Sequence, residues 1–99
     1  MHSASCERAA ISRAEQAGAE AQAIADSWRP VSVMVRVLPD GSVAALCDLL
    51  FTRAICLGVT REKWSMRFCF EDRTLADKRF AELQSEDDEP AGYVARRWG

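Results

Sequence analysis

The chain has very little histidine: His2 is the only one, and it lies at the second position. Serine and cysteine nucleophiles normally need a neighbouring base that the fold holds in place, and a terminal segment cannot hold one. Cys47 is followed by Asp48, but neighbouring residues point to opposite faces of a strand and diverge on a helix. The sequence therefore predicts no catalytic residue, although an enzyme centred on an acid or a cysteine stays open as a third hypothesis.

Close pairs of cysteines are also absent. Cys6, Cys47, Cys56 and Cys69 form no Cys-x-x-Cys pair, and structural zinc usually takes its ligands from such pairs in tight turns. No glycine-rich loop follows a predicted strand, as a phosphate-binding loop requires. The sequence thus predicts no metal ligand and no cofactor. It predicts four reduced cysteines buried in the core.

Long hydrophobic runs are missing too. No segment is long enough to span a bilayer, and the first residues lack the basic flank and apolar stretch of a secretion signal. We therefore expect a cytoplasmic protein with no membrane partner. A net charge of −2 also argues against nucleic acid as the main partner.

What the chain does contain is enough for one small domain. Its 99 residues are 48% hydrophobic and 28% charged, a balance typical of a globular chain. We predict a single domain over residues 1–90 and an aromatic, basic tail over residues 91–99. Alanine and arginine are frequent, and their GC-rich codons indicate a bacterial or phage genome, including that of a mobile element.

Residues 5–28 carry the pattern of a helix. Their apolar positions recur at steps of three and four, and Pro30 ends the segment. The stripe is mostly alanine, with Ile11, Ile24 and Trp28 as larger anchors. The same stripe could form the seam of a homodimeric coiled coil, but it lacks the leucine and valine that such seams use.

Two runs of alternating residues predict strands over 31–38 and 64–70. Valine occupies every second position of the first run, and Trp, Met or Phe does so in the second. Residues 43–57 fit either two strands, 43–48 and 51–57, or one helix. The tight return at Asp40-Gly41 favours the strands, because it suits an antiparallel hairpin.

A second helix is predicted over 73–84, with Asp72 as its N-cap and a buried stripe of Ala76, Phe80 and Leu83. The expected fold class is α+β: an N-terminal helix, an antiparallel sheet of three to four strands, and a C-terminal helix packed on one sheet face. We expect both helices on the same face, the one that carries Val31 and Trp64.

The surface residues suggest a binding site. Between Glu71 and Glu89 there are eight acids and three bases, and the tail ends in residue types enriched at interface hot spots. The predicted partner-binding residues are Glu86, Asp87, Asp88, Glu89, Tyr93, Arg96, Arg97 and Trp98. The tail either docks on the partner or folds back onto the domain.

We therefore expect a small non-enzymatic protein-interaction module whose partner is a protein with a basic surface. Such a module could act as an inhibitor or regulator by occluding a host protein, a strategy used within the anti-CRISPR class of inhibitors. The alternative hypothesis is a nucleic-acid-binding regulator that uses Arg36, Arg67, Arg96 and Arg97.

Overall fold

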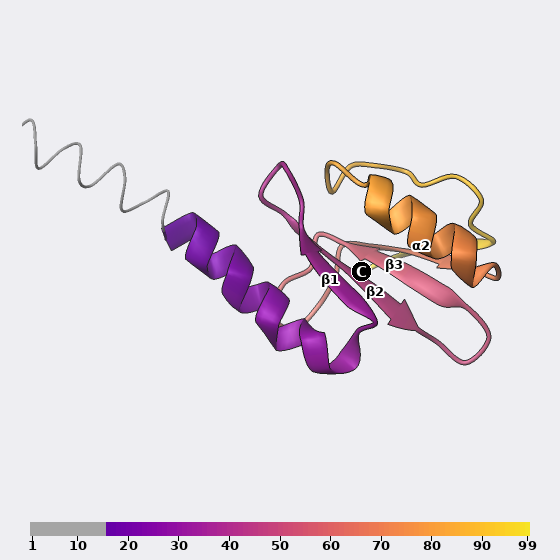
Figure 1. Cartoon of the computed structure of the whole chain (residues 1–99), viewed down its shortest axis with the longest axis horizontal. Coiled ribbons are helices and arrows are strands. Elements are labelled where there is room, and N and C mark those ends of the chain that lie inside the picture. The colour runs from indigo at the N-terminus through magenta and orange to yellow at the C-terminus, as the bar shows by residue number, and fades with distance from the viewer. Residues whose placement is uncertain (1–15) are drawn as a thin grey trace, which may run out of the picture.

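The computed structural model describes residues 16–99. A helix over residues 16–28 leads through a short 3-10 helix, η1 (Arg29–Val31), into a five-stranded sheet (Figure 1). The strands are β1 (Met34–Val37), β2 (Val43–Asp48), β3 (Arg53–Leu57), β4 (Met66–Phe70) and β5 (Ala95–Trp98), with helix α2 (Arg73–Glu82) between β4 and β5 in sequence. The fold is α+β, as expected. The expectations for His2, Cys6 and Ile11 lie outside the described residues.

Each strand pairs antiparallel with its neighbour in sequence, in the order β1-β2-β3-β4-β5. The segment 43–57 forms two strands, so the strand interpretation is confirmed. Leu50 and Phe51 form the tip of the hairpin between β2 and β3, which the Leu49 N–H closes by donating to the Thr52 carbonyl at 2.8 Å. Short connections join β1 to β4 as a meander, whereas the connection from β4 to β5 contains α2.

One face of the sheet packs against α2. The helix buries the predicted stripe of Ala76 and Phe80, with Leu83 just after its end. These residues lie in one cluster with the largest buried side chains of the middle strands, among them Ile55 and Phe70. Asp72 caps the helix as predicted, since its side chain accepts a hydrogen bond from the Leu75 N–H at 3.1 Å.

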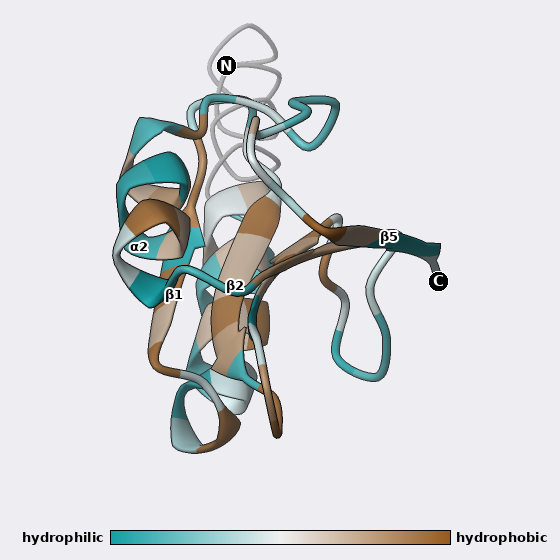
Figure 2. Cartoon of the chain, turned by 90° about the vertical axis from the view of Figure 1, so that its right-hand side faces the viewer, coloured by the Kyte–Doolittle hydropathy of each residue, from teal (hydrophilic) through white to brown (hydrophobic). Residues whose placement is uncertain are grey.

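The N-terminal helix packs on the opposite face. Ala21 and Ala25 are buried in a second cluster with small strand residues such as Ala45, while Ile24 and Trp28 are partly buried against it. Alanine on both sides allows a close approach of helix and sheet, so little area is buried for each residue. The middle strands, coloured brown for hydrophobicity in Figure 2, lie between the two helices.

The expectation that both helices pack on one face is wrong, and the register of the strands explains why. Val35 pairs with Ala45, Ala45 with Cys56, and Cys56 with Arg67. Val35 therefore lies on the same face of the sheet as Arg67. Phe68 follows Arg67 on β4, so its side chain points to the opposite face. The valine run and the aromatic run thus line opposite faces. Both faces are covered, so the sheet is the central layer of three.

The predicted strand ends also shift. Val31 lies in η1 beside Pro30, whose fixed φ suits the first turn of a helix. Trp64 lies in the loop before β4, and the segment 91–99 is not a free tail, because residues 95–98 pair with β4 as β5. Folding back is therefore the observed outcome for the end of the chain. Trp98 nevertheless stays 74% exposed and does not cover the domain.

Three cysteines fall within the described residues, and none of the three is in a disulfide. Cys56 and Cys69 are buried, as expected. Cys47 is only partly buried, because it lies near the end of β2 where the N-terminal helix turns into η1. The three thiols are therefore not equivalent, which the sequence pattern does not indicate.

Candidate partner-binding pocket

The acidic loop (Glu86, Asp87, Asp88 and Glu89) follows α2 and is held by hydrogen bonds. The Asp88 carboxylate accepts from the backbone N–H groups of Gln84 at 2.7 Å and Ser85 at 3.2 Å, which closes a turn. The Glu86 N–H donates to the Asp40 carboxylate at 3.0 Å, which ties the loop to the β1–β2 hairpin. The backbone of the loop is therefore fixed on both sides.

Strand β5 brings the end of the chain next to this loop. The Tyr93 hydroxyl donates to the Glu89 carboxylate at 2.6 Å, and the Arg96 guanidinium donates to the same oxygen at 3.1 Å. The carboxylate beside it raises the pKa of Tyr93, because ionising the hydroxyl would lose this bond. Arg96 also lies over the Trp98 ring, 5.5 Å from its centroid. Two distant segments thus form one polar and aromatic cluster.

The cluster borders an open pocket of about 430 Å³. Its lining combines the acidic loop with one side of β4 and β5: Ser65, Met66, Phe68, Glu86, Asp87, Asp88, Glu89, Arg96 and Trp98. Four carboxylates against one guanidinium leave three negative charges around a partly apolar floor. A pocket with these features suits a long side chain that has an apolar stem and a positive head.

The four carboxylates differ in what they already bind. Asp88 and Glu89 accept hydrogen bonds from the protein and hold the frame of the pocket. Within residues 16–99, the carboxylates of Glu86 and Asp87 have no hydrogen-bond or ion-pair partner. Both residues are exposed. They are therefore the two acids that an incoming cation can reach without breaking an existing bond.

The pocket gathers most of the residues predicted for partner binding. Six of them line it, and Tyr93 supports it through Glu89. Arg97 does not belong to it, since it lies between Arg96 and Trp98 on β5 and points to the other face. Met66 and Phe68, which form the floor, were not predicted as binding residues. Their alternation gives them a shared face, but only the pairing of β5 with β4 places that face beside the tail.

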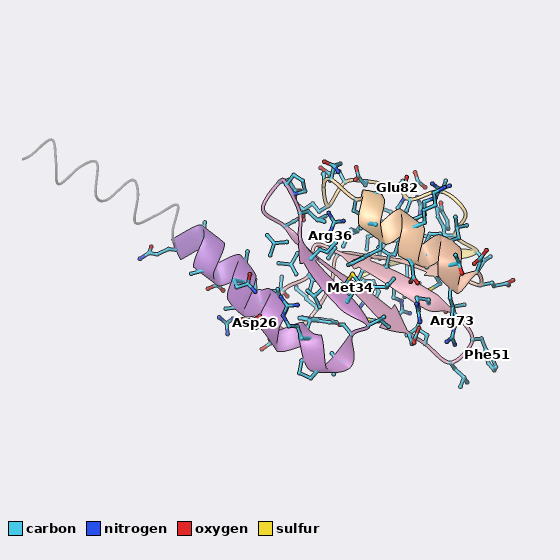
Figure 3. The ribbon with its side chains drawn as sticks, viewed as in Figure 1. Asp26, Met34, Arg36, Phe51, Arg73 and Glu82 are labelled. Atoms are coloured by element: carbon cyan, nitrogen blue, oxygen red, sulfur yellow. The ribbon has the colours of Figure 1, made fainter. Side chains whose placement is uncertain are left out.

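The four arginines of the nucleic-acid hypothesis do not form one surface. Arg36 points to the α2 face, where it donates to the Phe80 and Leu83 carbonyls at the end of that helix (Figure 3). Arg96 shares this face and is paired with Glu89. Arg67 and Arg97 are cross-strand neighbours on the opposite face. Arg36 and Arg67 therefore do not share the open basic face on which that hypothesis depends.

Apolar side chains are also exposed away from the pocket, among them Val31 and Val94. Leu50 and Phe51 are each 83% exposed at the tip of the β2–β3 hairpin, and Figure 3 shows Phe51 pointing away from the sheet. Val33, Met34 and Val37 are exposed along β1, an edge strand whose outer backbone groups have no neighbouring strand within the described residues. None of these side chains lines the pocket beside the acidic loop, which is called the acidic pocket below.

Between residues 16 and 99, no three His, Cys, Asp or Glu side chains converge as a metal ion would require. No helix within those residues is both long and apolar enough to cross a membrane.

Comparisons with known proteins add no relative. No protein-family model, curated protein or solved structure matches the chain significantly.

Proposed function

We propose that this protein is a non-enzymatic interaction module that binds a basic segment of a partner protein in the acidic pocket. The observation that carries the proposal is the convergence of the acidic loop with Trp98 and Arg96 around one cavity. Tryptophan and arginine are enriched at interface hot spots, and Trp98 is 74% exposed in spite of its size. A large exposed aromatic ring beside free carboxylates favours the docking of a partner.

The chemistry of the pocket indicates which side chain it receives. An arginine or lysine of the partner would lay its stem along Met66 and place its charge between Glu86 and Asp87, which lack partners within the described residues. The free face of Trp98 would add a cation–π contact, because the ring quadrupole attracts a positive charge. By covering a basic surface in this way, the module would act as an inhibitor or regulator by occlusion.

Peptide binding tests the proposal. Fluorescence anisotropy would compare a labelled arginine- and lysine-rich peptide with a glutamate-rich peptide of equal length, at low and at high salt. The basic peptide should bind and the acidic peptide should not. Binding should weaken as salt rises, since exposed charge pairs are screened.

Two double variants with the same change in charge make the test specific. Glu86→Gln with Asp87→Asn should weaken binding of the basic peptide roughly tenfold, because two exposed ion pairs together contribute about 1.4 kcal/mol. Glu62→Gln with Glu71→Gln removes two exposed acids outside the pocket and should leave binding unchanged. Equal losses in both variants would point to net charge alone and would contradict the proposal. Stronger binding of a nucleic-acid probe than of the basic peptide would favour the alternative hypothesis.

A further inference from the structure

The register of the middle strands collects three thiols and one guanidinium on the sheet face opposite α2. Cys47 pairs with Ala54, which pairs with Cys69, and Cys56 pairs with Arg67. Every second side chain of a strand lies on the same face of the sheet. Cys56 is two residues from Ala54, the partner of Cys47, so Cys47 and Cys56 are diagonal neighbours on β2 and β3. No function assigned above uses this cluster.

Cys47 differs from the other two thiols in its exposure and its polar neighbours. Cys56 is 3% exposed and Cys69 is 5% exposed, whereas Cys47 is partly open to solvent. The Ser32 hydroxyl oxygen lies 3.4 Å from the Cys47 sulfur, at the start of the chain segment that enters β1. Cys47 is therefore more accessible to a reagent in solution than Cys56 or Cys69.

Hydrogen bonds to the sulfur favour the thiolate form of Cys47. The neighbouring Cys56 thiol and the Ser32 hydroxyl, whose oxygen lies 3.4 Å from the Cys47 sulfur, stabilise the thiolate and lower the pKa of Cys47 to about 6. The interaction with Cys47 and the burial of Cys56 raise the pKa of Cys56, because a second thiolate beside the first would be repelled and poorly solvated. One thiol of the pair is thus disposed to ionise and the other to stay protonated.

Arg67 supplies an unpaired positive charge on the same face. Its guanidinium carbon lies 4.8 Å from the centroid of the Trp64 ring, and its Nε is buried without a hydrogen-bond partner. Among residues 16–99, no carboxylate forms an ion pair with it. A partly buried cation without a counter-charge favours an anion nearby, and a cysteine thiolate is the anion that this face can provide.

We propose that Cys47 is a nucleophilic modification site that accepts a mixed disulfide from a low-molecular-weight disulfide. The Cys47 thiolate attacks one sulfur of the small disulfide, a new S–S bond forms, and the original S–S bond breaks. The departing thiolate takes a proton from water. One disulfide replaces another, so no separate oxidant is needed.

Cys56 assists this exchange as a hydrogen-bond donor and does not become the disulfide partner. Diagonal neighbours on antiparallel strands have Cα atoms about 7–8 Å apart. A disulfide needs Cα atoms within about 6.8 Å, so closing one here would require the strands to move. The mixed disulfide is therefore the product expected on the folded protein.

Oxidised glutathione is a suitable probe, because trypsin separates the cysteines. Cleavage at arginine and lysine places Cys47 in peptide 37–53, Cys56 in 54–61, Cys69 in 68–73 and Cys6 in 1–8. The folded full-length chain would be incubated with the probe, its remaining thiols would be blocked with N-ethylmaleimide to prevent exchange, and its tryptic peptides would be read by mass spectrometry. Among the three described cysteines, peptide 37–53 should carry the glutathione adduct first. Adducts on Cys69 as fast as on Cys47, or a Cys47–Cys56 disulfide as the product, would overturn the proposal.

The pH dependence of alkylation separates a stabilised thiolate from mere exposure. With iodoacetamide, the rate at Cys47 should reach half of its maximum near pH 6, well below the ordinary thiol value of 9.0. Cys56→Ala should move this midpoint to higher pH, and Cys56→Ser should restore much of the shift because serine keeps a donor. Cys69→Ala, a buried cysteine on the same face, is the matched control and should leave the midpoint unchanged. A midpoint in the wild-type chain near the ordinary thiol value would refute the proposal even if every variant failed to fold.

Discussion

The Asp40 carboxylate accepts a hydrogen bond from the Glu86 backbone N–H at 3.0 Å, across 46 residues of sequence. Its other oxygen accepts from the N–H and the hydroxyl of Ser42. One side chain therefore shapes the β1–β2 turn and also anchors the start of the acidic loop. Asp40 does not line the pocket, so we regard it as a positioning residue for the proposed binding site.

Replacing Asp40 by Asn tests this positioning role. Asn has a single acceptor oxygen, so it cannot hold Ser42 and Glu86 in the same way. Hydrogen exchange at the Glu86 amide should become several-fold faster, and the basic peptide should bind more weakly, while amides in the middle strands keep their protection. Glu71→Gln changes an exposed acid outside this network and serves as the control. An unchanged exchange rate at Glu86 would show that the loop holds its shape without Asp40.

The same carboxylate predicts how stability responds to acid. The Ser42 hydroxyl and the backbone N–H groups of Glu86 and Ser42 lower the pKa of Asp40 from 3.8 to about 2. The folded state thus binds this proton more weakly than the unfolded state, so the stabilisation is present above pH 3.8 and is lost as the pH falls towards 2. The urea midpoint should fall in this window, and less steeply in Asp40→Asn. If the urea midpoint fell equally steeply with pH in the wild-type chain and in Asp40→Asn, Asp40 would not be the group responsible.

Two phenylalanines differ sharply in burial. Phe80 on α2 is 1% exposed and Phe51 at the hairpin tip is 83% exposed. Phe80→Ala should lower the free energy of unfolding by about 3–5 kcal/mol, since it leaves a cavity between helix and sheet. Phe51→Ala should change it by no more than about 0.5 kcal/mol. Urea unfolding measures both changes. A similar loss of unfolding free energy in the two variants would contradict the assignment of Phe80 to the core and Phe51 to the surface.

Local pattern was enough to predict most elements of the fold. Asp72 as N-cap and the stripe of Ala76, Phe80 and Leu83 follow from helical spacing, and the structure confirms them. The bounds 43–48 of β2 were also predicted, because the Asp40-Gly41 turn fixes where the returning strand begins. Gly41 adopts a φ of 87°, which residues with a side chain rarely take.

Long-range pairing is what the sequence could not predict. Ala95–Trp98 carries two arginines and no buried residue, so nothing in its own pattern marks it as a strand. It becomes one because the unpaired edge of β4 offers hydrogen bonds, such as that from the Gly99 N–H to the Ser65 carbonyl at 2.9 Å. The acids and the tail were each predicted to bind a partner, but their meeting around Met66 depends on this pairing. The division of the helices between two faces depends on register in the same way.

A titration followed by ¹H–¹⁵N correlation spectra tests the acidic pocket most directly. The full chain would be titrated with the basic peptide, and every assigned amide and indole N–H would be followed. The account predicts that the largest shifts occur at the Glu86 and Asp87 amides and at the Trp98 indole N–H. Shifts concentrated along β1 or at the Leu50-Phe51 tip would contradict the account. The absence of any shift on addition of the basic peptide would contradict it as well.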